Sequence, residues 1–522
     1  MQNIHLSTPK IFDILHLKSI IDFPKQKKPR LVTWALTVSG KKTVFIREGG
    51  LCDLIGKIFR TLKILAGDSK MHDEEFKTYY AEQRELLREA FAEIGRKAEL
   101  LLSVGQLLME NGADTAQITR DMKRVAAYMG IDAEKFHLHI MYTTLMLNIS
   151  DENHSHTSFR KCVKHAVDMR IISGVSRLTW RAMREHYTLD ELSGELKRIA
   201  SRPRFYNKWL TVCAAGTGCG AFCTLFGCDF NAAIYTAFSA IIGKLVQMQC
   251  AERFGINPYV SMMFAAFSAT IVAYMTHLLP TATPWHPMIA AALFMVPGIP
   301  MINAFGDMLN TYLISGAARI LHTGIIIGAM TFGIVFAIGM ADFDSFTQLA
   351  MRPESSYPLF AFAAAVGAAS FAIFFNLPPR LLYAAAIGGA ICVCTRNFFV
   401  FELGFGSEIG TLVGATFVSV IATQAIHWLH TPSLVLIVPA VIPLVPGVLI
   451  YRLLFAIINI RRLTLEELLS AVQSGVDALL IILAISIGAS MPNIFARRAF
   501  ERRSKDKQEK LLNEIYETDL HD

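Results

Sequence analysis

The stretch Phe294-Met-Val-Pro-Gly-Ile-Pro-Met-Ile-Asn-Ala-Phe-Gly-Asp307 decides the fold. It belongs to an apolar segment long enough to cross a bilayer, yet two prolines and a glycine interrupt it. Proline removes a helix hydrogen bond and clashes with the preceding turn, so backbone groups near Pro297 and Pro300 lose their partners. An unsatisfied backbone group is costly in lipid, so we expect protein or a watery cavity to cover this break. Gly298 lets another backbone or a ligand approach closely.

The break recurs in Val438-Pro-Ala-Val-Ile-Pro-Leu-Val-Pro-Gly447. A shift of 149 residues lays Val296-Pro-Gly298 on Val445-Pro-Gly447, and the same shift superposes every other apolar run on a partner without a gap. The chain therefore contains two similar halves. The identities between them include the pairs Gly218/Gly367, Phe222/Phe371, Phe226/Phe375 and Gly339/Gly488.

The apolar runs predict an all-α polytopic membrane protein with five spans in each half. An odd number of spans forces the second half to lie upside down relative to the first. Inverted repeats with broken helices are typical of secondary transporters, with the substrate site where the breaks meet. The ten predicted spans are 209–227, 230–249, 258–279, 287–306, 317–340, 357–376, 380–401, 407–429, 433–455 and 472–491.

The composition agrees with a membrane protein that carries a soluble part. Of the 522 residues, 53% are hydrophobic and only 18% are charged. The net charge of +7 comes from residues 1–70, which hold 13 Lys/Arg against 5 Asp/Glu. The basicity thus belongs to one terminal segment, and a nucleic-acid partner is not expected. The nine cysteines include no CxxC pair, so they are expected to be small buried apolar residues.

Five parts of the chain are predicted. Residues 1–70 are expected to be a poorly ordered extension or an arm attracted to anionic lipid, or else Met71 is the true start. No cleavable signal peptide is seen. The other parts are a cytoplasmic α+β domain over 71–205, the first membrane repeat over 206–350, the second over 351–495, and a charged tail over 496–522.

Within the soluble part, the apolar spacing predicts a helix that Asn111-Gly112 stops and a second helix that Asp114 caps. Alternating, β-favouring residues predict two or more strands, in 136–148 and in Lys161–Met169. Two helices are expected to follow, over 175–186 and 188–200. A capping box, Thr188-Leu-Asp-Glu191, opens the second of them.

The positions of Lys and Arg predict the orientation. Basic residues crowd before the first span and after the last, which places both termini in the cytoplasm of a cell whose inner (plasma) membrane holds the protein. The link 341–357 between the halves is acidic and is expected outside. Arg452, Arg461 and Arg462 oppose this rule, but inversion of the repeat requires their external placement.

The motif around the first break, followed by Ser315-Gly-Ala-Ala-Arg319, resembles the threonine/serine exporter family. Leu102-Ser-Val-Gly-Gln-Leu-Leu-Met-Glu-Asn-Gly-Ala-Asp114 is similar to the start of that family's cytoplasmic domain, and Val438–Gly447 to its second half. The resemblance covers about residues 85–495. It implies an inner-membrane exporter of small amino acids driven by the proton-motive force. A related two-subunit system is associated with succinate export, so a dicarboxylate remains the alternative substrate.

The expected site lies at the two breaks, where helix ends direct free N–H groups toward an anionic substrate. Asp307 is expected either to bind a substrate ammonium or a coupling proton, or to be an interfacial residue. Asn303 is expected to repair the broken backbone. Arg452, which takes the position of Asn303 in the second half, either clamps a carboxylate or reaches a lipid headgroup. The candidate site residues are Pro297, Gly298, Pro300, Asn303, Asp307, Pro443, Pro446, Gly447 and Arg452.

No catalytic residue, metal or cofactor is predicted. The partners expected are a small amino acid or dicarboxylate, protons and the lipid bilayer, and the pattern leaves room for a homo-oligomer. The glycine pairs Gly216/Gly220 and Gly324/Gly328 and the series Gly406/Gly410/Gly414 predict close helix packing. The histidines 137, 139, 154, 156 and 165 lack a ligand framework and are expected on the surface or in the core.

A function of another class is a membrane-anchored sensor or hydrolase that acts through the soluble domain. Ser173, His165 and Asp168 would be its reactive set, but no nucleophile-elbow glycines surround Ser173. That function predicts an expendable, unbroken anchor, which the repeated Pro-Gly breaks disfavour. The soluble domain is therefore expected to gate or regulate the pore.

Overall fold

The computed structural model describes 33–38, 42–47, 73–150, 155–185, 187–341, 356–429, 431–461 and 463–519. The chain forms two compact units, Met1–Ala90 and Phe91–Asp522. In the first unit, the antiparallel strands β1 (Thr33–Val38) and β2 (Lys42–Arg47) pair. The sequence patterns did not predict this hairpin. The rest of 1–70, and with it the expected terminal arm, lies outside the described residues.

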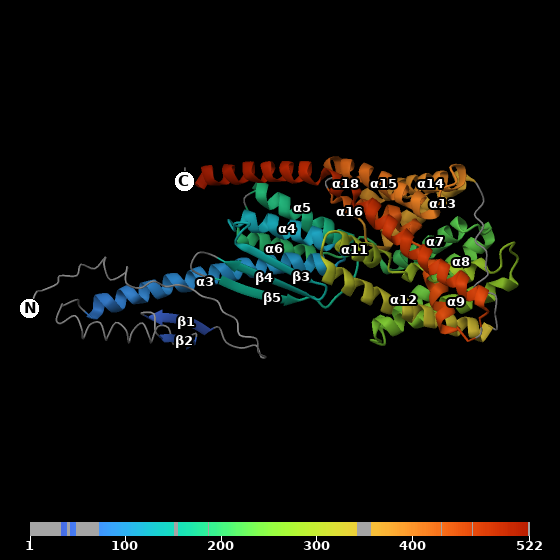
Figure 1. The fold of residues 1–522 in the computed structure, drawn as a ribbon, viewed down its shortest axis with the longest axis horizontal. Helices are drawn as coiled ribbons and strands as arrows, with labels where there is room; N and C mark the ends of the chain where they lie inside the picture. Colours follow the sequence, from blue (N-terminus) through green and yellow to red (C-terminus); the bar gives the residue numbers. More distant parts are fainter. Residues whose placement is uncertain are drawn as a thin grey trace, which may run out of the picture. The chain divides into compact units, whose positions relative to one another are not determined.

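An α+β domain (residues 91–205) begins the second unit, and Figure 1 shows its helices beside its sheet. Its elements are α3 (Asp73–Glu110, which starts in the first unit), α4 (Thr115–Tyr128), β3 (Phe136–Met141), β4 (Thr144–Ser150), β5 (Ser155–Lys161), α5 (Met169–Glu185) and α6 (Leu189–Ser201). The antiparallel sheet has the order β3-β4-β5. Leu101, Leu145 and Leu147 are among the side chains fully buried in this part of the core.

The predicted stop of α3 and the predicted caps of α4 and α6 are confirmed, but the helix expected over 175–186 begins earlier, since α5 starts at Met169. Gly112 follows α3 with a φ of +90°, which suits glycine, and Asp114 caps α4 by accepting a hydrogen bond from the Gln117 N–H. The capping box of Thr188 and Glu191 is present. The strand expected over Lys161–Met169 is wrong, because β5 ends at Lys161 and α5 already begins at Met169. The alternating residues between them form a connection that packs against α3.

The membrane-type helices follow in chain order. They are α7 (Lys208–Leu225), α8 (Phe230–Glu252), α9 (Pro258–Met275), η1 (Thr276–Leu278), α10 (His286–Ala290), η2 (Leu293–Met295), α11 (Gly298–Leu309), α12 (Leu313–Ala341), α13 (Tyr357–Phe374), η4 (Pro379–Leu381), α14 (Leu382–Asn397), η5 (Phe398–Glu402), α15 (Ser407–Leu429), α16 (Ser433–Val441), η6 (Ile442–Leu444), α17 (Gly447–Ile458) and α18 (Leu465–Asp519).

Among the described residues, six helices are long and apolar enough to cross a membrane, and two bent helix pairs bring the number to eight. The bent pairs contain the two predicted breaks. Helices α7 and α8 occupy the first two predicted spans but are not among these six. The structure therefore gives six to eight candidate spans among the described residues, and the arrangement with ten spans is taken up below as a proposal.

The repeat of 149 residues extends to the helix boundaries. Helix α13 begins and ends at the shifted positions of α7, and α17 does so for α11. The short turns η2 and η6 also coincide under the shift. Secondary structure, and not only hydropathy, thus repeats along the chain.

Contacts between the halves are reciprocal. Phe222 of α7 stacks on Phe371 of α13, the residue that the shift makes its equivalent, with ring centroids 5.0 Å apart. A Cβ on Gly218 would meet the Phe371 ring at 2.9 Å, and one on Gly367 would meet Phe222 at 2.8 Å. Each half thus presents the same residues of the repeat to the other, which is the contact pattern of a self-complementary interface.

Large apolar side chains lie exposed on the outside of these helices, for example Leu321, Phe332 and Phe336 of α12. Such a surface suits lipid and not water. Glycines let some helices approach closely, as predicted. A Cβ on Gly216, Gly220, Gly410 or Gly414 would lie within 2.8 Å of a neighbouring carbonyl oxygen. The packing role expected for Gly324, Gly328 and Gly406 is wrong, because a Cβ there would touch no neighbouring helix.

Candidate functional site

The two breaks have the same local structure. In the first, Pro297 (φ −79°, ψ 60°) separates η2 from α11, and the chain bends by 61°. In the second, Pro446 (φ −82°, ψ 53°) separates η6 from α17, and the bend is 55°. The Gly298 N–H donates to the Val296 carbonyl at 2.8 Å, and Gly447 repeats this bond to Val445 at 2.9 Å. A tight turn at each break thus satisfies one of the backbone groups that the proline frees.

The breaks lie against each other in space, as the sequence predicted. A Cβ on Gly298 would lie 3.0 Å from Ile442 and 3.3 Å from Val445. A Cβ on Gly447 would lie 2.9 Å from both Leu293 and Val296, which are the equivalent residues of the first half. The contacts between the breaks are therefore reciprocal, like those between α7 and α13. A side chain at either glycine would press on side chains of the opposite break, so both glycines favour this close approach.

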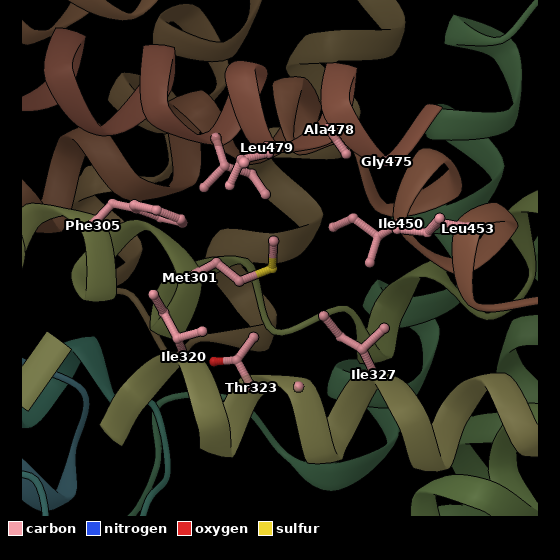
Figure 2. A pocket seen from close by; sticks show the side chains of 12 residues that line it. Met301, Phe305, Ile320, Thr323, Ile327, Ile450, Leu453, Gly475, Ala478 and Leu479 are labelled. Atoms are coloured by element: carbon pink, nitrogen blue, oxygen red, sulfur yellow. The ribbon is translucent and has the colours of Figure 1, made fainter. Parts of the chain in front are cut away.

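A cavity of about 210 Å³ lies next to the breaks, between α11, α12, α17 and α18. Figure 2 shows Met301 reaching into it between Phe305 and Ile450. The walls are apolar except for Thr323, whose buried hydroxyl lacks a hydrogen-bond partner among the described residues. The nine candidate site residues do not line this cavity.

Asp307 lies at the end of α11 in a buried polar cluster with the α+β domain. Its Oδ1 accepts a hydrogen bond from the Thr115 N–H at 2.9 Å, and its Oδ2 accepts one from the Thr115 hydroxyl at 2.7 Å. Arg319 Nε lies 2.9 Å from Oδ2, and Ser315 Oγ lies 3.3 Å from it. Asp307 and Arg319 are 1% and 2% exposed, so this charge pair is withdrawn from solvent.

Asn303 and Arg319 also bind the domain directly. The Asn303 side-chain amide donates to the Gly112 carbonyl at 2.9 Å, and Arg319 Nη2 donates to the Ala113 carbonyl at 3.0 Å. The expected repair of the broken backbone by Asn303 is thus replaced by a contact to a different segment, the α3–α4 turn. Together, Asn303, Asp307 and Arg319 fasten residues 112–115 to the first membrane half.

A second attachment joins the domain to the other half. Asn376, in the turn between α13 and α14, donates from its amide to Asp168 at 2.9 Å. The Met169 N–H donates to the Phe375 carbonyl at 2.9 Å, and the Tyr206 hydroxyl donates to the Leu377 carbonyl at 2.8 Å. Asn376 has a φ of +58°, and its shifted equivalent Gly227 also has a positive φ. The domain thus contacts both halves.

The remaining candidate residues are dispersed. Pro300 lies in the first turn of α11, and Pro443 lies in η6. Arg452 is half-buried on α17. Neither Thr115 nor Arg319 was predicted as a site residue. Both lie in or beside the family motifs, and these motifs were the signal that could have identified them.

The reactive set of a hydrolase is not assembled. Asp168 is engaged by Arg170 and Asn376, and the buried Ser173 hydroxyl donates to the Arg170 carbonyl. His165 stacks on Tyr142 instead. Among the residues that the structure describes, no group of three His, Cys, Asp or Glu side chains could hold a metal ion.

Two family models match the chain, over the regions that carry these breaks and attachments. Residues 99–341 match the model described as "Putative threonine/serine exporter", and residues 360–495 match the model described as "Threonine/Serine exporter, ThrE". The chain belongs to the threonine/serine exporter family. It is therefore a multi-pass membrane protein of an exporter family. Exporters are transport proteins and do not form a class of enzymes.

Curated relatives carry two kinds of name. The "Probable succinate transporter subunit YjjP" of Escherichia coli is 27% identical over 46% of this chain and 92% of its own length. Its Klebsiella aerogenes counterpart has the same identity and coverage. The "Probable threonine/serine exporter" of Mycobacterium tuberculosis is 22% identical over 69% of both chains. No solved structure matches.

Proposed function

We propose that this protein is a secondary active exporter of small amino acids of the threonine/serine type, driven by the proton-motive force. The observation that carries the proposal is the reciprocal packing of two equivalent broken helices. Two such elements related by a two-fold rotation are the working parts of alternating-access transporters. The family membership supports export as the direction of transport.

The proposal includes ten spans in two inverted repeats, with both termini in the cytoplasm. The docking of the α+β domain supports the inversion. This domain binds the end of α11 in the first half and the α13–α14 turn in the second. In a ten-span chain these two places share a face only if the second half is inverted. The basic residues that flank the spans assign that face to the cytoplasm.

In this arrangement the domain covers the cytoplasmic end of the first broken helix, and we assign it the role of a gate. The α3–α4 turn and the helix α11 share a buried ion pair and several hydrogen bonds. A substrate that approaches from the cytoplasm would meet this contact before it reaches the breaks. Opening would require the domain to move from α11, or α11 to move with the domain.

A dicarboxylate such as succinate is the second candidate substrate, because two relatives of this chain bear a succinate transporter name. The residues leave both choices open, since free N–H groups at a break suit any carboxylate. Arg452 offers a discriminating contact in the second half. As a carboxylate clamp it should not be replaceable by lysine, which cannot bind bidentately.

The test is efflux from proteoliposomes preloaded with serine, threonine or succinate, with and without a pH gradient. We expect serine and threonine efflux that an inwardly directed proton gradient accelerates. Efflux of succinate alone would establish the second candidate, and Arg452→Lys should then weaken it. The absence of efflux of all three solutes from correctly inserted protein would contradict the proposed function.

A further inference from the structure

Three aromatic and imidazole side chains meet where the α+β domain touches α12. Tyr142 comes from the β3–β4 turn, His165 from the β5–α5 connection, and His322 from α12; we call them the His–Tyr cluster. Tyr142 and His165 stack with centroids 4.2 Å apart, and the Tyr142 hydroxyl lies 2.8 Å from His322 Nδ1. The two imidazole rings are 5.3 Å apart.

Charged groups of both signs surround this cluster: Arg319, which is paired with Asp307 at 2.9 Å, and Glu110. The guanidinium of Arg319 lies 5.1 Å from the centre of the Tyr142 ring, and Tyr259 of α9 stands edge-on to His322. Glu110 of α3 is the opposing carboxylate that acts on His165. His165 Nδ1 is buried and has no hydrogen-bond partner in the described part of the chain. A proton added to either imidazole would therefore face Arg319 and the other imidazole at short range.

Docking should consequently depend on pH. Burial lowers the pKa of His165 below its ordinary 6.5, and the neighbouring His322 and Arg319 lower it further, while Glu110 acts in the opposite direction. A histidine released into water regains its ordinary pKa, so the undocked state binds more protons than the docked state. Docking is then fully favourable above about pH 6.5 and weakens as the pH falls through and below that value.

We propose that the His–Tyr cluster is a proton-operated latch that holds the α+β domain on α12 and releases it when the cytoplasm becomes acidic. The inference rests on the proposed function in taking the domain as the cytoplasmic gate. Protonation places two positive charges beside Arg319, and undocking separates them. The latch would link the cytoplasmic opening of the exporter to the accumulation of acid in the cell.

The distance between domain and membrane helices tests the latch without any substrate. Spin labels would be attached at Lys123→Cys on α4 and Arg253→Cys after α8, two exposed positions, in full-length protein without native cysteines. In lipid nanodiscs we expect one short distance at pH 7.5. A longer distance should grow in at pH 5.5, with the docking constant falling by up to about tenfold per pH unit for each proton bound.

The matched variants are His165→Gln/His322→Gln, which should remain docked at pH 5.5, and His137→Gln/His139→Gln, which changes two exposed histidines of β3 and should behave as the wild type. Tyr142→Phe is the second variant, for the case that the double variant fails to fold. It keeps the stacked ring but removes the hydroxyl, and it should shift the pH at which half of the protein is undocked. The latch is contradicted if the wild type shows no change with pH, or if the His165/His322 double variant still undocks. The first result would leave serine efflux, and with it the proposed function, untouched.

Discussion

At the scale of single residues, the structure gives Asp307 a neighbour that the sequence patterns did not reveal. Arg319 follows it by twelve positions, on the next helix, and the two form a buried ion pair. Hydropathy identified Asp307 as a charge within an apolar run, but pairing depends on how α11 and α12 cross, which spacing alone does not determine. Arg452 illustrates the same limit, since its shifted equivalent is Asn303 and the two residues have different surroundings.

The ion pair predicts that the losses of stability caused by mutating Asp307 and Arg319 are not additive. Asp307→Asn leaves Arg319 as a buried, uncompensated cation, which typically costs about 3–5 kcal/mol. Arg319→Met should cost less in the Asp307→Asn background than in the wild type, because the charge has then been removed together with its partner. Thermal unfolding of the four proteins in detergent would measure this coupling. Additive losses would show that the pair does not stabilise the fold.

The two break glycines predict a second result at this scale. Alanine at Gly298 or Gly447 places a methyl group about 3 Å from side chains of the opposite break. We expect each substitution to reduce serine efflux several-fold while insertion into the membrane is retained. The measurement is initial efflux rate normalised to inserted protein. Wild-type rates in both variants would remove the breaks from the transport path.

At the scale of elements, the sequence predicted the helices better than the strands. Breaks, caps and span positions follow from proline, glycine and long apolar runs, whose effects are local. The strand expected in Lys161–Met169 failed because alternation also occurs in a connection that packs one side against α3. The number of glycine contacts was overestimated because spacing does not show what lies opposite a glycine. Gly324 and Gly328 share the spacing of packed glycines, but a Cβ on either would meet nothing within 4 Å, and Gly324 lines the cavity.

This difference between glycines can be measured. A Cβ on Gly414 would lie 2.7 Å from the Cys392 carbonyl of α14, whereas one on Gly328 would meet nothing within 4 Å. Gly414→Ala should therefore destabilise the protein by about 1–3 kcal/mol. Gly328→Ala should stabilise it by up to about 1 kcal/mol, because alanine has the higher helix propensity. Thermal melts of the two variants decide, and an equal shift in both would contradict the packing of α14 on α15.

At the scale of the whole molecule, the repeat was readable from the sequence because every apolar run recurs at one fixed shift. The docking of the domain was not, since it depends on contacts such as Thr115 to Asp307 that join segments 192 residues apart. Orientation remains a prediction. Single cysteines at Asp344 and at Lys505, in a cysteine-free variant, should be labelled by an impermeant thiol reagent in intact cells at 344 only. Labelling at 505 would overturn the topology.

The measurement that tests the central claim most directly is to lock the two breaks together. Cysteines at Gly298 and Val445, whose side chains would lie in van der Waals contact, should form a disulfide in a cysteine-free variant reconstituted in proteoliposomes. Our account predicts that oxidation abolishes serine efflux and that reduction of the same vesicles restores it, while each single cysteine variant is insensitive to the oxidant. Undiminished efflux through fully cross-linked protein would contradict the claim that transport proceeds by relative movement of the paired broken helices.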